Sequence, residues 1–150
     1  MSIIAWDRKI IAADKMSEYC GLATQVTKLR ISKNRNAIIG FTGGYENGLG
    51  LIEWFENGEN AKDWPDWQKS EDWCRFIVAV SNHVYSYEKL PYAQGDDNPF
   101  MAWGSGRDYA LGAMAQGANA IEAVKIACNF CVSCGLGVDA FELATMKRII

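Results

Sequence analysis

The first fifteen residues, MSIIAWDRKIIAADK, place two apolar strand-like segments at the very start of the chain. Residues 3–6 and 8–13 predict strands, with a turn at Asp7 between them. Chain termini usually fray, because a few residues bury too little apolar area to offset the entropy lost when they are ordered. An N-terminus committed to the core therefore has either a structural reason, as an edge strand containing Ile3, Ile4 and Trp6, or a chemical one, in which the terminus itself reacts.

The hydrophobic period changes along the rest of the chain, and it predicts the other elements. Alternation predicts strands at 23–31 and 36–44, a hairpin at 72–88 that turns near Ser81 and Asn82, a short strand at 100–106, and a last strand from 138 onward. Helical spacing predicts a helix that stops near Gly58 and two helices at 107–117 and 118–132, and a loop or short helix starts near Pro65.

This order of elements limits the fold class. Helices that arrive in groups, and not after every strand, favour an α+β fold over a doubly wound parallel sheet. If the strands form two sheets, helices can cover both outer faces, which gives a four-layer αββα sandwich. A chain of 150 residues that is 49% hydrophobic has room for one sizeable core. We expect residues 1–150 to form a single domain.

Charge and hydropathy exclude several partners. The formal net charge of −3 argues against nucleic acid, whose binding would call for Lys and Arg clustered on one face. No apolar run approaches the roughly 18–20 residues that a membrane-spanning helix needs, and the start lacks a basic signal-peptide region. We expect a cytoplasmic protein that binds neither nucleic acid nor membrane.

The five cysteines are an odd number, which argues for reduced thiols over a disulfide framework. Cys128, Cys131 and Cys134 form a CxxCxxC pattern, but Gly135 follows where the ferredoxin pattern continues to a fourth Cys and Pro. A zinc site would also need a fourth ligand, and only two other cysteines and one histidine are present. We expect no metal and no cofactor, and a metal protein built on these cysteines is the weakest hypothesis.

Common hydrolase and nucleotide motifs are missing. The glycine-rich segments 40–44 and 104–106 match neither a P-loop nor GxGxxG nor the nucleophile elbow. A Ser-His-Asp triad would have to use His83, the single histidine, which lies in a strand-like run. The start of the chain remains as the candidate site.

Ser2 combines two chemical groups if Met1 is removed, as initiator methionine generally is when the second residue is small. Its α-amine would have a pKa of about 7.7–8.0, so it can act as a general base at neutral pH. The hydroxyl of the same residue can then attack a carbonyl. Such a site needs a cation, a carboxylate that holds the cation, and backbone N–H donors for the oxyanion.

Three residues can supply these supports. Lys28 lies among apolar strand neighbours and needs a partner if it faces inward. Asp14, at the end of a predicted strand, can be that partner, and Gly43 allows the close backbone approach that an oxyanion hole requires. Each also has an ordinary explanation: a solvated lysine, a turn-forming aspartate and a loop glycine.

Taken together, these residues resemble the proteasome-type N-terminal-nucleophile hydrolases. The matching segments are IIAWDRKIIAADK, TKLRI, IIGFTGG before a helix, FMAWGSGRDYALGAM and CGLGVDAFEL, and they follow the family's order over nearly the whole chain. The opening is most similar to compact bacterial and phage members. The resemblance implies an αββα sandwich, polypeptide substrates, assembly into a homo-oligomeric ring, and room for an ATPase partner.

The family's functional positions fall on particular residues of this chain. The nucleophile position falls on Ser2, the acid on Asp14, the essential lysine on Lys28, and the oxyanion glycine on Gly43. The serine that supports the terminal amine falls on Ser105. The resemblance therefore implies a serine- or threonine-type endopeptidase.

Departures from the family pattern keep a second hypothesis open. The nucleophile is Ser where the family has Thr, so the methyl group that restricts its rotamer is missing. An acid near the late glycine motif is replaced, at Cys131, and a retained Met1 would block the amine. The alternative is a catalytically inactive protein of the same fold that serves assembly or scaffolding.

Overall fold

Two five-stranded antiparallel sheets and a separate hairpin contain the strands of the part of the chain that the computed structural model describes, residues 2–95 and 97–150. The first sheet has the order β10–β1–β2–β11–β12, and its strands are Met101–Trp103, Ile4–Trp6, Ile10–Asp14, Val138–Glu142 and Lys147–Arg148. The second has the order β5–β6–β7–β8–β9, and its strands are Leu29–Ile31, Ile38–Thr42, Arg75–Val80, His83–Tyr87 and Gln94–Gly95.

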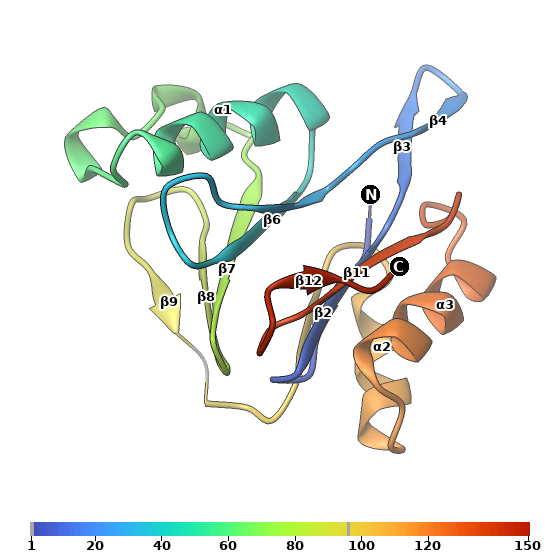
Figure 1. The fold of residues 1–150 in the computed structure, drawn as a ribbon. Helices are drawn as coiled ribbons and strands as arrows, with labels where there is room; N and C mark the ends of the chain where they lie inside the picture. The colour runs from blue at the N-terminus through green and yellow to red at the C-terminus, as the bar shows by residue number, and fades with distance from the viewer. Residues whose placement is uncertain (1, 96) are drawn as a thin grey trace.

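Helices cover the outer faces of both sheets. Helices α2 (Arg107–Ala115) and α3 (Ala120–Phe130) pack on the first sheet, and α1 (Tyr45–Glu56) packs on the second, as Figure 1 shows. The short 3₁₀ turns η1 (Ala61–Asp63) and η2 (Asp66–Lys69) follow α1. This arrangement confirms the expected α+β class and the four-layer αββα sandwich. Within residues 2–95 and 97–150, no helix has the length and apolar character that crossing a membrane requires.

Strand β1 is an interior strand, because it pairs with β10 on one side and with β2 on the other. Its successive side chains enter different layers: Ile4 and Trp6 face the second sheet, whereas Ala5 faces α2 and α3. All three are buried, so the strand is continuously apolar. The edge-strand explanation of the apolar N-terminus is therefore wrong, and the chain begins in the middle of the first sheet.

A row of alanines crosses the helix-facing side of the first sheet. Ala5 is paired with Ala102 and with Ala12, and Ala12 is paired with Ala140. All four side chains are fully buried beneath α2 and α3. Small side chains let the helices approach the strands closely, so this row sets the separation of the layers.

The hairpin of β3 (Met16–Tyr19) and β4 (Leu22–Gln25) belongs to neither large sheet. It extends beyond both of them in Figure 1, and β4 is exposed along its whole length. The chain then leaves the hairpin at Val26 and enters the second sheet at β5. The single strand expected at 23–31 is therefore wrong, because the two halves of that alternating segment pair with different partners.

Two local signals are confirmed. Helix α1 ends at Glu56, and Gly58 follows it with a φ of +118°, a conformation that glycine adopts without strain. Strands β7 and β8 form the expected hairpin, and its turn lies at Ser81 and Asn82.

Candidate active site

A buried ion pair between Asp14 and Lys28 lies at the centre of the candidate site. Asp14 is the last residue of β2, and Lys28 directly precedes β5, so each large sheet contributes one partner. The Lys28 Nζ is 2.6 Å from the Asp14 Oδ1, and the two side chains are 5% and 0% exposed. A charge this deeply buried needs a partner, and the expected contact of Lys28 with Asp14 supplies it.

The Asp14 carboxylate accepts hydrogen bonds from three further parts of the chain. Its Oδ1 also accepts from the backbone N–H of Ile3 at 3.0 Å, and its Oδ2 accepts from those of Met16 at 3.3 Å and Gly135 at 3.1 Å. These contacts fix the orientation of the carboxylate. They also hold the Lys28 ammonium within two hydrogen-bond lengths of the Ile3 nitrogen, at the start of the chain.

Burial also affects the pKa of Lys28. Burial lowers the pKa of Lys28 from its ordinary value, and the attraction and hydrogen bond of Asp14 oppose that change. A lysine whose pKa is lowered gives up its proton more readily than a solvated lysine does. The pair can therefore assist proton transfer at a neighbouring group.

Ser2 is the candidate for that neighbouring group. It precedes Ile3, whose N–H is bound by Asp14, and it is fully buried. Its hydroxyl oxygen has no hydrogen-bond partner among the described residues. Buried polar atoms are rarely left unpaired, so a buried hydroxyl without a partner calls for an explanation. The expected removal of Met1 concerns a residue outside the described part of the chain.

The GSG segment holds the backbone of Ser2 in place. The carbonyl oxygen of Ser2 accepts a hydrogen bond of 3.2 Å from the N–H of Gly106. Gly104 has a φ of +105°, and a Cβ at this position would come within 2.2 Å of the same oxygen. Gly106 is less confined, because its Cβ would meet side chains of Ile3, Ala127 and Cys134 at 3.0–3.1 Å. The close approach of the Ser2 carbonyl thus requires a glycine at position 104, and the packing around position 106 leaves little room for a side chain.

Gly43 lies in the turn between β6 and α1. Its φ is +120°, and a Cβ there would lie 2.7 Å from the Cys74 Sγ, so the position excludes other residues on two grounds. Gly43 is exposed, and its N–H donates to no described residue. A free N–H just before a helix start can stabilise a negatively charged oxygen.

Ser105 makes no hydrogen bond or ion pair with Asp14 or Lys28 in the described chain, and it lies between the two glycines that pack against Ser2 and Ile3. Its side chain is exposed, and no hydrogen bond joins its hydroxyl to another residue of the described chain. Ser105 and Gly43 line the same cavity of about 480 Å³. The structure therefore brings Asp14, Lys28 and the Ile3 N–H that follows Ser2 together, and Gly43 and Ser105 line one cavity.

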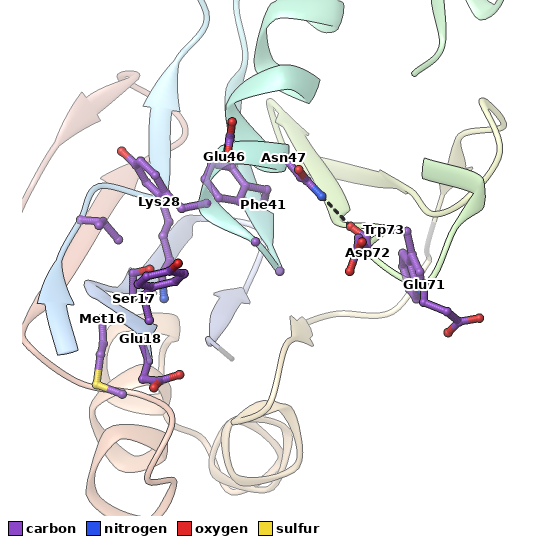
Figure 2. Close-up of a pocket in the computed structure, with 15 residues that line it drawn as sticks. Met16, Ser17, Glu18, Lys28, Phe41, Glu46, Asn47, Glu71, Asp72 and Trp73 are labelled. Atoms are coloured by element: carbon purple, nitrogen blue, oxygen red, sulfur yellow. Dashed lines mark hydrogen bonds between the residues drawn. The ribbon is translucent and has the colours of Figure 1, made fainter. Parts of the chain in front are cut away.

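A larger cleft of about 730 Å³ leads to Lys28 and Gly43. One wall is formed by β3, with Met16, Ser17 and Glu18, and the other by the start of α1 and by residues 71–73 (Figure 2). Gly43 lines this cleft and the smaller cavity, so the two spaces meet at the candidate oxyanion position. An extended peptide can enter such a cleft.

Two contributions to the site were missed by sequence reasoning. The N–H of Gly135 reaches Asp14 from the loop after α3, and Gly104 makes room for the carbonyl of Ser2. The glycines that follow the CxxCxxC pattern and those that flank Ser105 were the available signals. In the described part of the chain, no cluster of three or more His, Cys, Asp or Glu side chains has a geometry that could hold a metal ion.

Comparison with known proteins gives matches in structure and none in sequence. No protein-family model matches the chain, and no curated protein does. BPH from Thiobacillus denitrificans superposes with a TM-score of 0.72 at 20% identity, over 94% of this chain and 98% of that one. HslV from Trypanosoma brucei gives 0.68 at 18% identity, over 94% and 98% of the two chains. An Anbu (Gly-1) mutant from Hyphomicrobium sp. strain MC1 gives 0.70 at 11% identity, over 100% and 86%.

This chain has the proteasome-type N-terminal-nucleophile hydrolase fold. The match extends over almost the whole length of the compared chains, so it concerns the complete sandwich and not one motif. Within this fold, Asp14 ends β2, Lys28 directly precedes β5, and Gly43 directly follows β6. One related structure is BPH in complex with epoxomicin, with a TM-score of 0.71.

Proposed function

We propose that the protein is a peptidase in which Ser2, exposed by removal of Met1, is the nucleophile. The observation that carries this proposal is the buried Ser2 hydroxyl, which has no partner among the described residues and belongs to the residue directly before the Ile3 N–H that Asp14 binds. A buried ion pair is weak evidence for stability, because desolvation offsets much of the attraction between the charges. The pair binds the backbone N–H of Ile3, the residue that follows Ser2, and this attachment to the start of the chain supports a catalytic role.

The proposed mechanism assigns one task to each group. The amine of Ser2 takes the proton from its own hydroxyl, and the oxygen attacks the scissile carbonyl carbon. Lys28, positioned by Asp14, lowers the pKa of the hydroxyl, and the N–H of Gly43 stabilises the tetrahedral oxyanion. The amine then protonates the leaving nitrogen, and water hydrolyses the acyl-enzyme. Ser105 supports the terminal amine.

The cellular setting is proposed from the fold likeness. The substrate is unfolded polypeptide, and residues 1–150 act as a single domain in a homo-oligomeric ring in the cytoplasm. An ATPase partner that feeds the ring fits the same proposal. Gel filtration with light scattering tests the ring, because a monomer would elute near 16.7 kDa.

An inactive scaffolding subunit is the second candidate, and one observation favours it. The Ser2 side chain is fully buried and lines neither of the two cavities described above, so substrate reaches the hydroxyl only after a local opening. Serine in place of threonine also leaves the nucleophile's rotamer less restricted. Under this hypothesis Met1 is retained and the ion pair serves the fold alone.

Intact mass spectrometry with an epoxyketone inhibitor distinguishes the two candidates. The peptidase should lack Met1 and should gain the mass of one inhibitor per chain. Ser2→Ala is a matched control, because alanine is also small enough for Met1 removal but has no hydroxyl, and it should not be labelled. Lys28→Met keeps the length of the side chain without its charge and should slow labelling by about 10²-fold or more. Retained Met1, or equal labelling of Ser2→Ala, would contradict the proposal.

A further inference from the structure

The end of α3 and the loop after it contain three of the five cysteines. Cys128 lies in the last turn of α3, Cys131 directly follows the helix, and Cys134 lies three residues further along the chain. All three are free thiols, and within the described part of the chain they belong to no cluster that could hold a metal ion. The mechanism proposed above does not use them either, so this CxxCxxC pattern needs another explanation.

Cys131 and Cys134 lie at the two ends of a β-turn. The N–H of Cys134 donates to the carbonyl oxygen of Cys131 at 3.1 Å, and Val132 and Ser133 form the turn between them. The Cα atoms at the ends of a β-turn lie within about 7 Å of each other, a range that suits a disulfide. The two side chains also interact, since the pKa of Cys134 is raised by burial and by a side-chain hydrogen bond with Cys131.

The two thiols differ in exposure, which sets the order in which they would react. Cys131 is partly exposed, whereas Cys134 is only 5% exposed. Val132, between them, is 95% exposed, so the turn lies at the surface, where a small oxidant can reach it. In thiol–disulfide exchange the accessible thiolate attacks first, and a neighbouring thiol then resolves the mixed disulfide. Cys131 is placed for the first step and Cys134 for the second.

Cys128 is a less suitable partner for Cys131. The Cys131 N–H donates to the Ala127 carbonyl at 2.8 Å and closes the last turn of α3, so the two thiols are three residues apart on a helix. At this spacing the Cβ atoms are about 5–6 Å apart, which exceeds the roughly 3.5–4.5 Å that a disulfide requires. Burial also raises the pKa of Cys128 to about 11, which keeps this thiol protonated.

The surroundings of Cys134 connect it to the candidate site. The next residue, Gly135, donates its N–H to the Asp14 Oδ2 at 3.1 Å. A Cβ at position 106 would lie 3.0 Å from the Cys134 Sγ, so the sulfur packs against Gly106, whose N–H binds the Ser2 carbonyl. A displacement of Cys134 therefore reaches Asp14 through the adjacent residue and Ser2 through one packing contact.

We propose that Cys131 and Cys134 form a reversible disulfide, and that its formation moves the Gly135 N–H away from Asp14 and slows the reaction of the candidate site. The S–S bond is about 2.05 Å long, much shorter than the separation of two hydrogen-bonded thiols, so the loop must move when the bond forms. The disulfide and the movement of the loop do not depend on the proposed function. Only the loss of activity rests on it.

The oxidant is a small disulfide such as oxidised glutathione. The Cys131 thiolate attacks one glutathione sulfur, the glutathione S–S bond breaks, and one glutathione leaves as a thiolate. Cys134 then loses its proton to solvent, and its sulfur attacks the Cys131 sulfur and displaces the second glutathione thiolate. The released thiolates take up the protons that the two cysteines lost. Two protein thiols are thus oxidised, one external disulfide is reduced, and excess reduced glutathione reverses the reaction.

Differential alkylation tests the disulfide. The protein is equilibrated with mixtures of reduced and oxidised glutathione, its free thiols are blocked with iodoacetamide, and the remaining cysteines are reduced and labelled with N-ethylmaleimide. We expect two of the five cysteines, Cys131 and Cys134, to become protected together in one chain, as fragment ions assign them. Cys128→Ser is the matched control and should keep this protection, whereas Cys131→Ser should abolish it.

Several outcomes of that experiment would overturn the inference. They are five unprotected thiols under oxidising conditions, protection at Cys20, Cys74 or Cys128 in place of the proposed pair, and a disulfide that joins two chains.

Hydrogen exchange and inhibitor labelling test the coupling to the site. In the oxidised protein, the amides of Met16 and Gly135, which donate to Asp14, should exchange faster than in the reduced protein. Epoxyketone labelling should be at least about tenfold slower and should recover on reduction, because small displacements of catalytic groups cost large factors in rate. Cys131→Ser should show neither response to the oxidant.

The two readouts separate this inference from the peptidase proposal. If the reduced protein is not labelled at all, the peptidase proposal alone fails, and hydrogen exchange still decides whether the disulfide loosens the hold on Asp14. A disulfide that forms without any change in the exchange of Met16 and Gly135 overturns the coupling, as does an equal response to the oxidant in Cys131→Ser.

Discussion

The Asp14 carboxylate accepts more hydrogen bonds than any other side chain of the candidate site. Its two oxygens bind Lys28 and three backbone N–H groups, which come from the chain start, β3 and the loop after α3. An ionised carboxylate with several donors is strongly held, because charge-assisted hydrogen bonds are about twice as strong as neutral ones. The same contacts that orient the carboxylate therefore attach the N-terminus to both halves of the molecule.

Gly104 should tolerate no side chain. We expect Gly104→Ala to lower the free energy of unfolding by about 2–4 kcal/mol, because the residue has positive φ and its Cβ would overlap the carbonyl of Ser2. Urea denaturation measures the change. Gly112→Ala, inside α2 and without a neighbour within 4 Å of its Cβ, should instead stabilise by about 0.5–1 kcal/mol. Similar effects of the two substitutions would contradict the assigned close approach.

At the scale of elements, the separation of the helices from the first sheet depends on side-chain volume. Ala102, Ala5, Ala12 and Ala140 form one row under α2 and α3, and no larger residue interrupts it. The loop that follows α3 brings Gly135 to Asp14. A change in the packing of α3 therefore moves part of the candidate site.

Ala12→Leu tests this coupling. The added volume should push α3 outward, lower the free energy of unfolding by about 1–3 kcal/mol, and weaken the hold of the loop on Asp14. Ala23→Leu, on the exposed strand β4, makes the same change of volume and should shift stability by less than about 0.5 kcal/mol. Thermal or urea unfolding gives the stabilities, and inhibitor labelling gives the effect on the site. A stable, normally labelled Ala12→Leu protein would show that the layer spacing is not restrictive.

The hairpin β3–β4 depends on the rest of the molecule for its order. A two-stranded hairpin is marginally stable alone, and the tip of this one exposes Tyr19 and Leu22. Two hydrogen bonds stabilise its base. The Val26 N–H donates to the Lys15 carbonyl at 2.7 Å, and the Gln25 side-chain amide donates to the Leu136 carbonyl at 3.0 Å. Hydrogen exchange should therefore be fast at the tip and slower toward the base.

At the scale of the whole molecule, alkaline pH should destabilise the fold. Burial and the nearby Glu59 raise the pKa of Tyr85 to about 12, and burial with a 2.5 Å hydrogen bond to Glu59 also raises that of Tyr87. Between pH 10 and 12 the unfolded chain loses these protons while the folded chain keeps them, so the unfolded state binds fewer protons and stability falls as pH rises. The fall is at most about 1.4 kcal/mol per pH unit for each tyrosine.

Urea unfolding at pH 8, 10 and 11 measures this dependence. The double variant Tyr85→Phe/Tyr87→Phe should flatten the curve between pH 10 and 11, and absorbance at 295 nm should show two of the six tyrosines titrating late in the wild-type protein. The lowered pKa of Lys28 makes the free energy of unfolding rise with pH at pH values below the ordinary pKa of lysine. This contribution is the same in the wild-type protein and the double variant, so it cancels when the two are compared. An unchanged slope in the double variant would contradict the assignment.

The sequence predicted correctly those elements whose position depends on residues close together in the chain. The hairpin that turns at Ser81 and Asn82 and the helix that ends before Gly58 follow from hydrophobic period and from turn residues close in sequence. The segment 23–31 failed, because its alternation continues through a point where the chain passes from one sheet to another. Hydrophobic periodicity indicates that a segment is a strand, but it does not indicate which strand that segment pairs with.

The sequence by itself determined the grouping of strands and helices, and hence the αββα class, along with the choice of Asp14 and Lys28 as partners. Their catalytic role, and that of Ser2, Gly43 and Ser105, stays a prediction. Only the tertiary structure decided that β1 is an interior strand, that Gly135 reaches Asp14 from 121 residues away, and that Glu18 and Glu71 face one cleft. The physical reason is range: helix and turn preferences act over a few residues, whereas these contacts exist only after the layers have packed.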